Sequence, residues 1–308
     1  MRLPRLRRQR TPVTAGGRPE QAPLRVAAMT MTCDEGDMLR RWLDYYGCQL
    51  GRDSLVVLDD HSTDGSTDGL DCSVVRLPPA PWREGWTQAR RVMVNAVSRA
   101  LLQTYDAVIF TDVDEFLVAD PDEYSGLLDY VTRQSRDVLA PVGLNMLHDA
   151  REEPPIDPAR PILGQRSLVK FVPNMCKPVL KREPWEWSAG THGIRSEFRV
   201  DHGLLLLHLK YYDEGHVRRS ADLRTAAFAS GRGSPASAWP LGGDELVDRL
   251  RSWVDGKPPA ELDVSLLDLP VPRHVEKGDF FRVDGNQMQA MEGNDVLRLP
   301  RRFVRVAL

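Results

Sequence analysis

Three carboxylates stand close together in the sequence VIFTDVDEFLV, residues 108–118. Asp112, Asp114 and Glu115 follow an apolar segment that is typical of a buried strand. Ionised carboxylates this close repel one another, and each is costly to remove from water. Mg²⁺ or Mn²⁺ would remove the repulsion, because hard cations prefer oxygen ligands and often share them with substrate phosphates. Asp112 and Asp114 are therefore candidate metal ligands, with a solvated acidic turn as the alternative.

A second polar cluster follows another apolar segment, in DSLVVLDDHSTDGSTDG, residues 53–69. Asp, Ser, Thr and Gly favour turns, so a turn alone is one explanation. Asp59 and Asp60 are more than a turn needs, however, and carboxylates at a strand end can accept hydrogen bonds from a nucleoside. No Gly-x-Gly-x-x-Gly motif follows a strand, which disfavours a Rossmann dinucleotide site.

Strands and helices must alternate along the chain to position these clusters. Strands are predicted in residues 24–32, 53–69, 72–78, 108–118, 137–147 and 199–213, and helices in 35–51, 85–105, 123–134, 217–230 and 244–256. This alternation predicts an α/β fold with a mixed, mostly parallel central sheet flanked by helices. Ligands bind beyond the carboxyl ends of such strands, where three polar clusters are expected to meet. These clusters are Thr30 to Glu35, Asp59 to Asp64, and Asp112 to Glu115.

Composition narrows the range of functions. The net charge of −3 gives no basic field that would indicate nucleic-acid binding. The four cysteines form no Cys-x-x-Cys pair, which disfavours zinc and favours reduced thiols in a cytoplasmic protein. Residues 1–23 are basic and lack the apolar core of a secretory signal. We expect a disordered tail there, which could make weak peripheral contact with anionic lipid.

Several of these segments resemble family 2 glycosyltransferases. LVVLDDHSTDGS (residues 55–66) is similar to that family's V-V-D-D-x-S-x-D-G-T strand and turn. WREGWTQARRVMVNA (82–96) resembles its next helix opening, although Arg91 replaces the usual Asn. VIFTDVDEFL (108–117) resembles its Asp-x-Asp strand.

One branch of that family matches further segments. TMTCDEGDMLRRWLDYY (residues 30–46) resembles the branch's entry motif, with Glu35 as its acid and Cys33-Asp34 where Lys-Asn is common. Gly190-Thr191-His192, and Leu207-His208 followed by Lys210, resemble two later motifs. The matches cover about residues 25–215 in the family's order.

The resemblance implies a GT-A fold, the nucleotide-diphospho-sugar transferase fold, over residues 24–215. Residues 216–308 would then be a partly helical extension. It also implies a nucleoside-diphosphate sugar donor, Mn²⁺ or Mg²⁺, and inversion at the anomeric carbon. The acceptor hydroxyl would belong to a glycan, a lipid-linked molecule or a small molecule.

The site residues follow from the motifs and the chemistry. Asp112, Asp114 and His208 are the expected metal ligands, and a satisfied core histidine is the alternative for His208. The residues expected to bind the nucleotide sugar are Thr32, Glu35, Asp59, Asp60, Asp64, Arg90, Asp112 and Lys177. Inversion also needs a base for the acceptor hydroxyl. Its candidates are His192, Glu115 and Glu197, with Glu186 and Asp149 also available, and the sequence does not choose among them.

The sequence is open to two other interpretations. In a haloacid-dehalogenase-type phosphatase, Asp112 would be a nucleophile. However, Phe116 stands where those enzymes place Thr or Val, and DDHSTDGS is left without a role. In a catalytically degenerate transferase-like domain, the chain would only bind carbohydrate or a partner. The Arg91 and Cys33-Asp34 departures favour that interpretation, and the intact acidic motifs oppose it.

Overall fold

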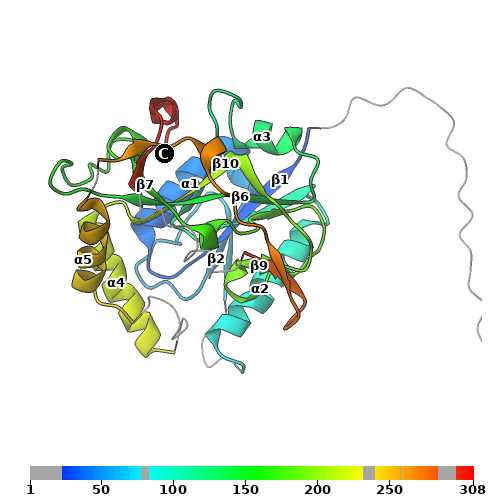
Figure 1. The fold of residues 1–308 in the computed structure, drawn as a ribbon. Coiled ribbons are helices and arrows are strands. Elements are labelled where there is room, and N and C mark those ends of the chain that lie inside the picture. Colours follow the sequence, from blue (N-terminus) through cyan, green and yellow to red (C-terminus); the bar gives the residue numbers. More distant parts are fainter. Residues whose placement is uncertain (1–22, 78–82, 232–239, 257, 284–295) are drawn as a thin grey trace, which may run out of the picture.

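The computed structural model describes residues 23–77, 83–231, 240–256, 258–283 and 296–308 (Figure 1). It confirms the predicted fold class, a mixed α/β fold with a large central sheet flanked by helices. The strands of this sheet are β1 (Val26–Thr32), β2 (Leu55–Asp59), β3 (Ser73–Arg76), β4 (Ala107–Phe110), β5 (Glu115–Ala119), β6 (Val138–Leu147), β7 (Leu168–Phe171), β8 (Leu180–Lys181), β10 (Val200–Tyr211), β11 (Ala260–Glu261) and β14 (Val296–Arg298). Their order is β11-β14-β7-β6-β8-β4-β1-β2-β3, and β10 pairs with both β5 and β6.

The other elements surround this sheet. The helices are α1 (Gly36–Leu50), α2 (Trp86–Leu101), α3 (Leu127–Arg133), α4 (Glu214–Ala229) and α5 (Gly243–Val254). The 3₁₀ helices are η1 (Arg52–Ser54), η2 (Ile162–Gly164), η3 (Pro173–Met175), η4 (Ala189–Thr191), η5 (Val264–Leu266) and η6 (Arg301–Arg305). A smaller sheet contains β9 (Gly193–Ile194), β12 (Arg273–Val275) and β13 (Phe280–Arg282). None of the helices in the described part of the chain is long and apolar enough to cross a membrane.

The four strands β3, β2, β1 and β4 are all parallel, which brings their carboxyl ends to one edge. Thr32 pairs with Asp59, and Met29 pairs with Phe110. β1 is buried along its whole length because both faces of the sheet are covered. Val26 and Ala28 pack on the α1 side, whereas Ala27, Met29 and Met31 pack on the α2 side.

The segment 108–118 differs from the single strand that the sequence predicts. It forms two strands, β4 and β5, which are separated by a turn at Asp112–Asp114. The Glu115 N–H donates to the Asp112 carbonyl at 3.0 Å, which closes the turn. β5 then pairs antiparallel with β10, so that Glu115 lies opposite His208. The apolar residues on either side of the turn hide this reversal in the sequence.

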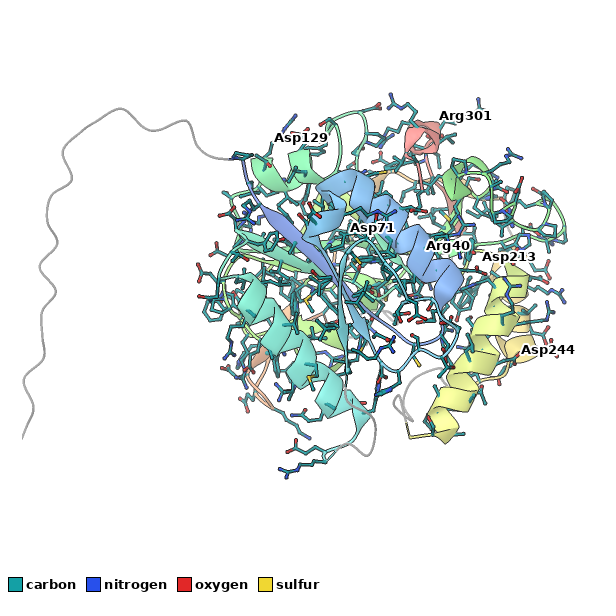
Figure 2. The ribbon with its side chains drawn as sticks, turned by 180° about the vertical axis from the view of Figure 1, so that it is seen from behind. Arg40, Asp71, Asp129, Asp213, Asp244 and Arg301 are labelled. Atoms are coloured by element: carbon teal, nitrogen blue, oxygen red, sulfur yellow. The ribbon has the colours of Figure 1, made fainter. Side chains whose placement is uncertain are left out.

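The segment after residue 215 is joined to the same sheet. β14 pairs with β7, and β11 pairs with β14. α4 follows β10 directly and packs on α5, and Figure 2 labels Asp213 and Asp244 at the starts of these two helices. The boundary at residue 215 stays a prediction. The predicted tail falls almost wholly outside the described residues.

Candidate active site

The alternation of side chains along β2 and β4 sends two carboxylates towards α2. Val56 and Leu58 face the α2 side, so Asp60 lies on that side. Val108 and Phe110 do the same on β4, and Asp112 continues the pattern. These carboxylates meet the first two turns of α2. They are therefore brought together by the pleat of two parallel strands, although 52 positions separate them in the sequence.

Asp59 organises the turn that follows β2. Its side chain is fully buried and accepts from the Ser62 N–H at 2.8 Å and the Thr67 hydroxyl at 3.0 Å. The Arg76 guanidinium lies 2.9 Å from the same carboxylate. Burial raises the pKa of Asp59, but these hydrogen bonds outweigh it and lower the pKa below its ordinary value. Asp59 thus shapes the turn, and its neighbour is the carboxylate that reaches the cavity.

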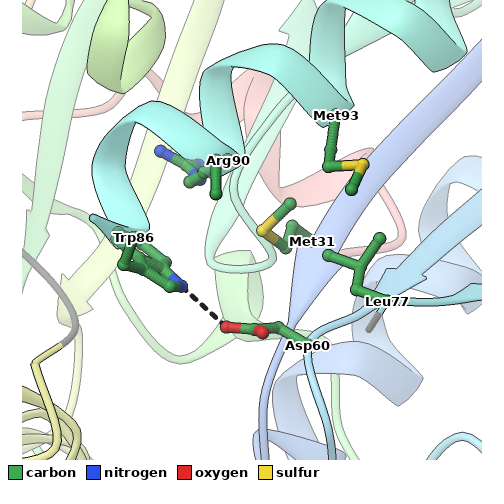
Figure 3. Close-up of a pocket in the computed structure, with 7 residues that line it drawn as sticks. Met31, Asp60, Leu77, Trp86, Arg90 and Met93 are labelled. Atoms are coloured by element: carbon green, nitrogen blue, oxygen red, sulfur yellow. Dashed lines mark hydrogen bonds between the residues drawn. The ribbon is translucent and has the colours of Figure 1, made fainter. Parts of the chain in front are cut away.

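Asp60 lines a small, mainly apolar cavity beside α2 (Figure 3). The Trp86 indole N–H donates to Asp60 Oδ2 at 2.7 Å. The rest of the lining consists of Met31, Leu77, Ala89, Arg90 and Met93. The cavity, of about 20 Å³, has room for a water molecule but not for a nucleobase ring, and it places a carboxylate and a guanidinium beside apolar side chains.

Arg90 joins this cavity to the acidic turn. Its guanidinium donates to Asp112 Oδ1 and lies over the rings of Trp86 and Phe110. Burial alone would raise the pKa of Asp112, but Arg90 and Lys177 outweigh burial and lower it. Asp112 is therefore a carboxylate neutralised by cations, and those cations can bind phosphate.

Lys177 and Glu115 form a buried ion pair under the turn. Lys177 Nζ lies 2.7 Å from Glu115 Oε1, and each side chain is 2% exposed. The other oxygen of Glu115 accepts from the Asp112 N–H at 3.0 Å. Burial disfavours the ammonium, but the Glu115 and Asp112 carboxylates prevail and raise the pKa of Lys177. Both oxygens of Glu115 are thus engaged in holding Lys177 and the turn.

Asp114 and His208 face each other across the antiparallel pair of β5 and β10. His208 Nε2 lies 3.2 Å from Asp114 Oδ2, and Nδ1 lies 2.8 Å from Asn145 Oδ1. If Nδ1–H donates to Asn145, the neutral ring presents a lone pair to a carboxylate, which is repulsive. A proton or a metal ion between them removes the repulsion, and a carbonyl that holds the second ring nitrogen is common behind metal-bound histidine. The arrangement fits the predicted role of Asp114 and His208 as metal ligands.

Asp112 does not complete a three-ligand set. Within the described ranges, no group of three or more His, Cys, Asp or Glu side chains is arranged to hold a metal ion. Asp112 is paired instead with Arg90 and lies 3.8 Å from Lys177. Mg²⁺ is often held by one or two carboxylates, with substrate phosphates and water as its other ligands. Asp114 and His208 therefore suit a cation that arrives together with a diphosphate.

Glu35 is an acid whose pKa changes strongly beside this cluster. Burial, and then the negative charge of Asp114, raise its pKa to about 8. Arg224 and Arg90 act in the opposite direction without cancelling these effects. Glu35 is consequently protonated at neutral pH in the metal-free protein.

The Glu35→Gln variant is expected to gain stability relative to the wild type as pH rises from about 4.5 to 8. In this window native Glu35 keeps a proton that the unfolded chain releases, so wild-type stability falls with rising pH. The effect is absent below about pH 4.5 and complete above about pH 8, with a slope of at most about 1.4 kcal/mol per pH unit. Urea unfolding in EDTA at several pH values measures it, with Glu123→Gln as the exposed control. If the free energies of unfolding of Glu35→Gln and the wild type changed in parallel with pH, the raised pKa of Glu35 would be contradicted.

His192 follows a strained segment and is held by the backbone. Gly190 and Thr191 have positive φ angles of 73° and 61°, and Thr rarely adopts such values. His192 Nδ1 lies 2.9 Å from the Asn174 carbonyl, so Nδ1 carries the hydrogen and Nε2 the lone pair. Burial, and then the positive charge of Lys177, lower the pKa of His192 to about 4. The ring is therefore neutral at pH 7.

Buried polar atoms without partners gather on the segments that carry these residues. Such atoms are rare in native proteins unless water or a ligand satisfies them. In the described part of the chain they belong to Thr30, Thr32, His61, Ser66, Asn174, Thr191, His216, Arg224 and Tyr130. Apart from Tyr130 on α3, each lies within three positions of a predicted site residue in the sequence, or on α4 near Asp114. A polar ligand would satisfy a set distributed in this way.

The remaining predicted residues are placed less centrally. Asp64 is exposed and accepts from the Gly36 N–H at 3.3 Å, at the start of α1. Glu197 is exposed between β9 and β10, and none of the contacts among the described residues joins it to the acidic turn. Glu186 pairs with Arg91 at 3.3 Å. Asp149 pairs with Arg151 at 2.7 Å. The structure thus brings together Glu35, Asp60, Arg90, Asp112, Asp114, Glu115, Lys177, His192 and His208.

Sequence reasoning missed three residues that lie at Asp114 or behind His208. Arg224 Nη2 lies 3.7 Å from Asp114 Oδ2. His216, two turns earlier on α4, is near enough for Asp114 to act on its pKa. Asn145 on β6 holds the ring of His208. No local motif marks any of them, and only the pairing of β10 with β5 and β6 brings them to the site.

No protein-family model and no curated protein matches this chain. Among solved structures, it is similar to the mannosyltransferase PcManGT from Pyrobaculum calidifontis in complex with GDP-Man and Mn²⁺, at 15% identity and a TM-score of 0.32. That match covers 79% of this chain and 80% of the other. It is also similar to a mannose-1-phosphate geranyltransferase from Thermus thermophilus, at 10% identity and a TM-score of 0.28, covering 90% and 73%. Scores this low do not establish a common fold, so function rests on the geometry of the site.

Proposed function

We propose that this protein is an inverting, metal-dependent glycosyltransferase. It would move a sugar from a nucleoside-diphosphate sugar to an acceptor hydroxyl, with Mn²⁺ or Mg²⁺ as its cation. The observation that carries the proposal is the meeting of Asp60, Asp112 and Asp114 with cationic side chains at one edge of the parallel strands. Clustered carboxylates interleaved with arginine and lysine side chains at a strand edge suit a metal-bound diphosphate.

The contacts of the site support a direction for the donor. The nucleobase would lie beside Asp60 and Trp86, and Arg90 both lines the cavity there and donates to Asp112. Arg90 and Lys177 would bind the phosphates, because both are held beside the turn by carboxylates. A divalent cation at Asp114 and His208 would neutralise the charge that develops on the leaving diphosphate.

His192 is the candidate base that best keeps a usable acceptor atom. Its Nε2 carries the lone pair, and the ring is neutral at pH 7. Glu115 is engaged with Lys177 and the turn, which favours a positioning role. Glu197 lies on an exposed segment. Among the three predicted candidates, His192 would take the acceptor's proton and Glu115 would hold the turn.

A donor screen tests the proposal. With Mn²⁺ present, one of UDP-, GDP- or dTDP-sugars is expected to raise the melting temperature of the wild type. At a hundred times its dissociation constant the donor should add about 2.7 kcal/mol of stability. Slow metal-dependent hydrolysis of that donor should accompany binding. Stabilisation without any hydrolysis or transfer would favour a degenerate binding domain, and no stabilisation by any donor would overturn the proposal.

A further inference from the structure

α4 places a partly buried arginine beside Asp114, in a part of the chain that matches no motif. The Arg224 side chain is 15% exposed, and its Nη2 lies 3.7 Å from Asp114 Oδ2. Its Nη1 is buried and donates to no residue that the structure describes. Burying a charged donor without an acceptor is costly, so this nitrogen is suited to an anionic ligand.

A second polar atom on α4 has the same character. His216 Nε2 is buried and has no partner in the described part of the chain. Burial is the main cause that lowers the pKa of His216 to about 4, so its ring is neutral at pH 7. Two turns of helix separate His216 from Arg224, and both lie close enough to Asp114 to interact with its charge. The Asp114 side of the turn is therefore rich in unsatisfied polar atoms.

The cations are divided between the two sides of the turn. Arg90 and Lys177 lie on the Asp112 side, and Arg90 also lines the cavity that contains Asp60. Arg224 lies on the Asp114 side. Arg90 and Arg224 both act on the pKa of Glu35, so the two guanidinium groups lie around one acid. A nucleotide with its base near Asp60 would then have Arg90 nearest its first phosphate and Arg224 available to its second.

We propose that Arg224 binds the β-phosphate of the donor and of the nucleoside-diphosphate product. α4 would then complete the donor site from outside the segment that resembles family 2 glycosyltransferases. This inference rests on the proposed function. The inference goes further than the proposed function because it names one side chain and one phosphate. The inference and the proposed function can therefore be tested separately.

Titration calorimetry with nucleoside di- and monophosphates tests the assignment. UDP, GDP and dTDP, each with its monophosphate, are titrated with Mn²⁺ into the wild type, Arg224→Met and Arg224→Lys. Arg224→Met is expected to weaken diphosphate binding about 10- to 100-fold, because a charge-assisted hydrogen bond is lost. Its monophosphate affinity should stay within about 3-fold. Arg224→Lys keeps the positive charge but loses the paired N–H donors of the guanidinium. Its diphosphate affinity should therefore lie between those of the wild type and Arg224→Met.

Arg219→Met is the matched control, because Arg219 is exposed on the same helix. It should bind both nucleotides as the wild type does. If Arg224→Met binds diphosphate normally, or loses di- and monophosphate equally, the assignment of Arg224 is wrong while the proposed function stands. If the wild type binds none of the nucleotides, the proposed function fails and the assignment fails with it. Should Arg224→Met not fold by circular dichroism, Arg224→Lys carries the same comparison.

Discussion

The Asp114→Asn variant is expected to lose about 10²- to 10³-fold in kcat/KM for sugar transfer while keeping its fold. His208 Nε2 and Arg224 Nη2 both lie close to Asp114 Oδ2, at 3.2 and 3.7 Å. An amide keeps the shape but removes the negative charge that a cation requires. The leaving diphosphate would then depart with less of its charge neutralised. Initial rates of transfer or donor hydrolysis, measured over a range of Mn²⁺ concentrations, check the prediction.

The control for this variant is Asp71→Asn. Asp71 is 69% exposed and pairs on the surface with Arg52, so its removal should leave the rate unchanged. The apparent affinity for Mn²⁺ should fall in Asp114→Asn and stay constant in Asp71→Asn. If Asp114→Asn folds, as verified by circular dichroism, and turns over at the wild-type rate, Asp114 is not a metal ligand. That result would contradict the proposed metal dependence.

The first half of the fold could be predicted because its signals are local. Segments 24–32, 35–51 and 85–105 carry continuous apolar or helical patterns, and β1, α1 and α2 form within them. The strand ends follow from the same patterns. Because parallel strands end at one edge, the meeting of Asp60 and Asp112 could be expected without knowing the register.

The turn between β4 and β5 could not be read in the same way. FLV (residues 116–118) resumes the apolar pattern of VIF (108–110) after the carboxylates, and nothing local shows that it forms a second strand of opposite direction. What divides them is pairing with β10, more than 80 positions away, which draws β5 antiparallel. In the folded protein one oxygen of Glu115 accepts from the turn and the other pairs with Lys177, which changes this residue from a candidate base into a support for Lys177.

The α2 helix illustrates a second limit. Arg91, which departs from the family pattern, pairs with Glu186 at 3.3 Å. Asn95, one turn later, is buried and exchanges two hydrogen bonds with the Trp187 backbone, at 2.8 and 3.0 Å. A polar residue inside a helix predicts exposure from sequence alone. Its burial here depends on the Trp187 backbone N–H and C=O, which bond to its amide and which only the tertiary structure brings to the helix.

The Lys177→Met variant is expected to lower the free energy of unfolding by about 3–5 kcal/mol. Lys177 and Glu115 are each 2% exposed and 2.7 Å apart, so methionine fills the space but leaves a buried carboxylate without its cation. The cost lies in that uncompensated charge rather than in lost contact area. Urea unfolding followed by circular dichroism at pH 7 measures it. Lys277→Met makes the same chemical change at an exposed position and should have an effect of at most about 0.5 kcal/mol.

A double variant separates lost charge pairing from lost packing. Glu115→Gln/Lys177→Met removes both charges and should recover a large part of the stability that Lys177→Met loses. The loss in Lys177→Met should also shrink below about pH 4.5, because Glu115 without its cation can take up a proton and become neutral. Its folded pKa would lie above the unfolded value, so the penalty develops only as pH rises past that value. The opposite result would be a loss of stability that does not depend on pH and is equal in Lys177→Met and in the double variant. It would mean that Lys177 stabilises the protein by packing and not by pairing with the charge of Glu115.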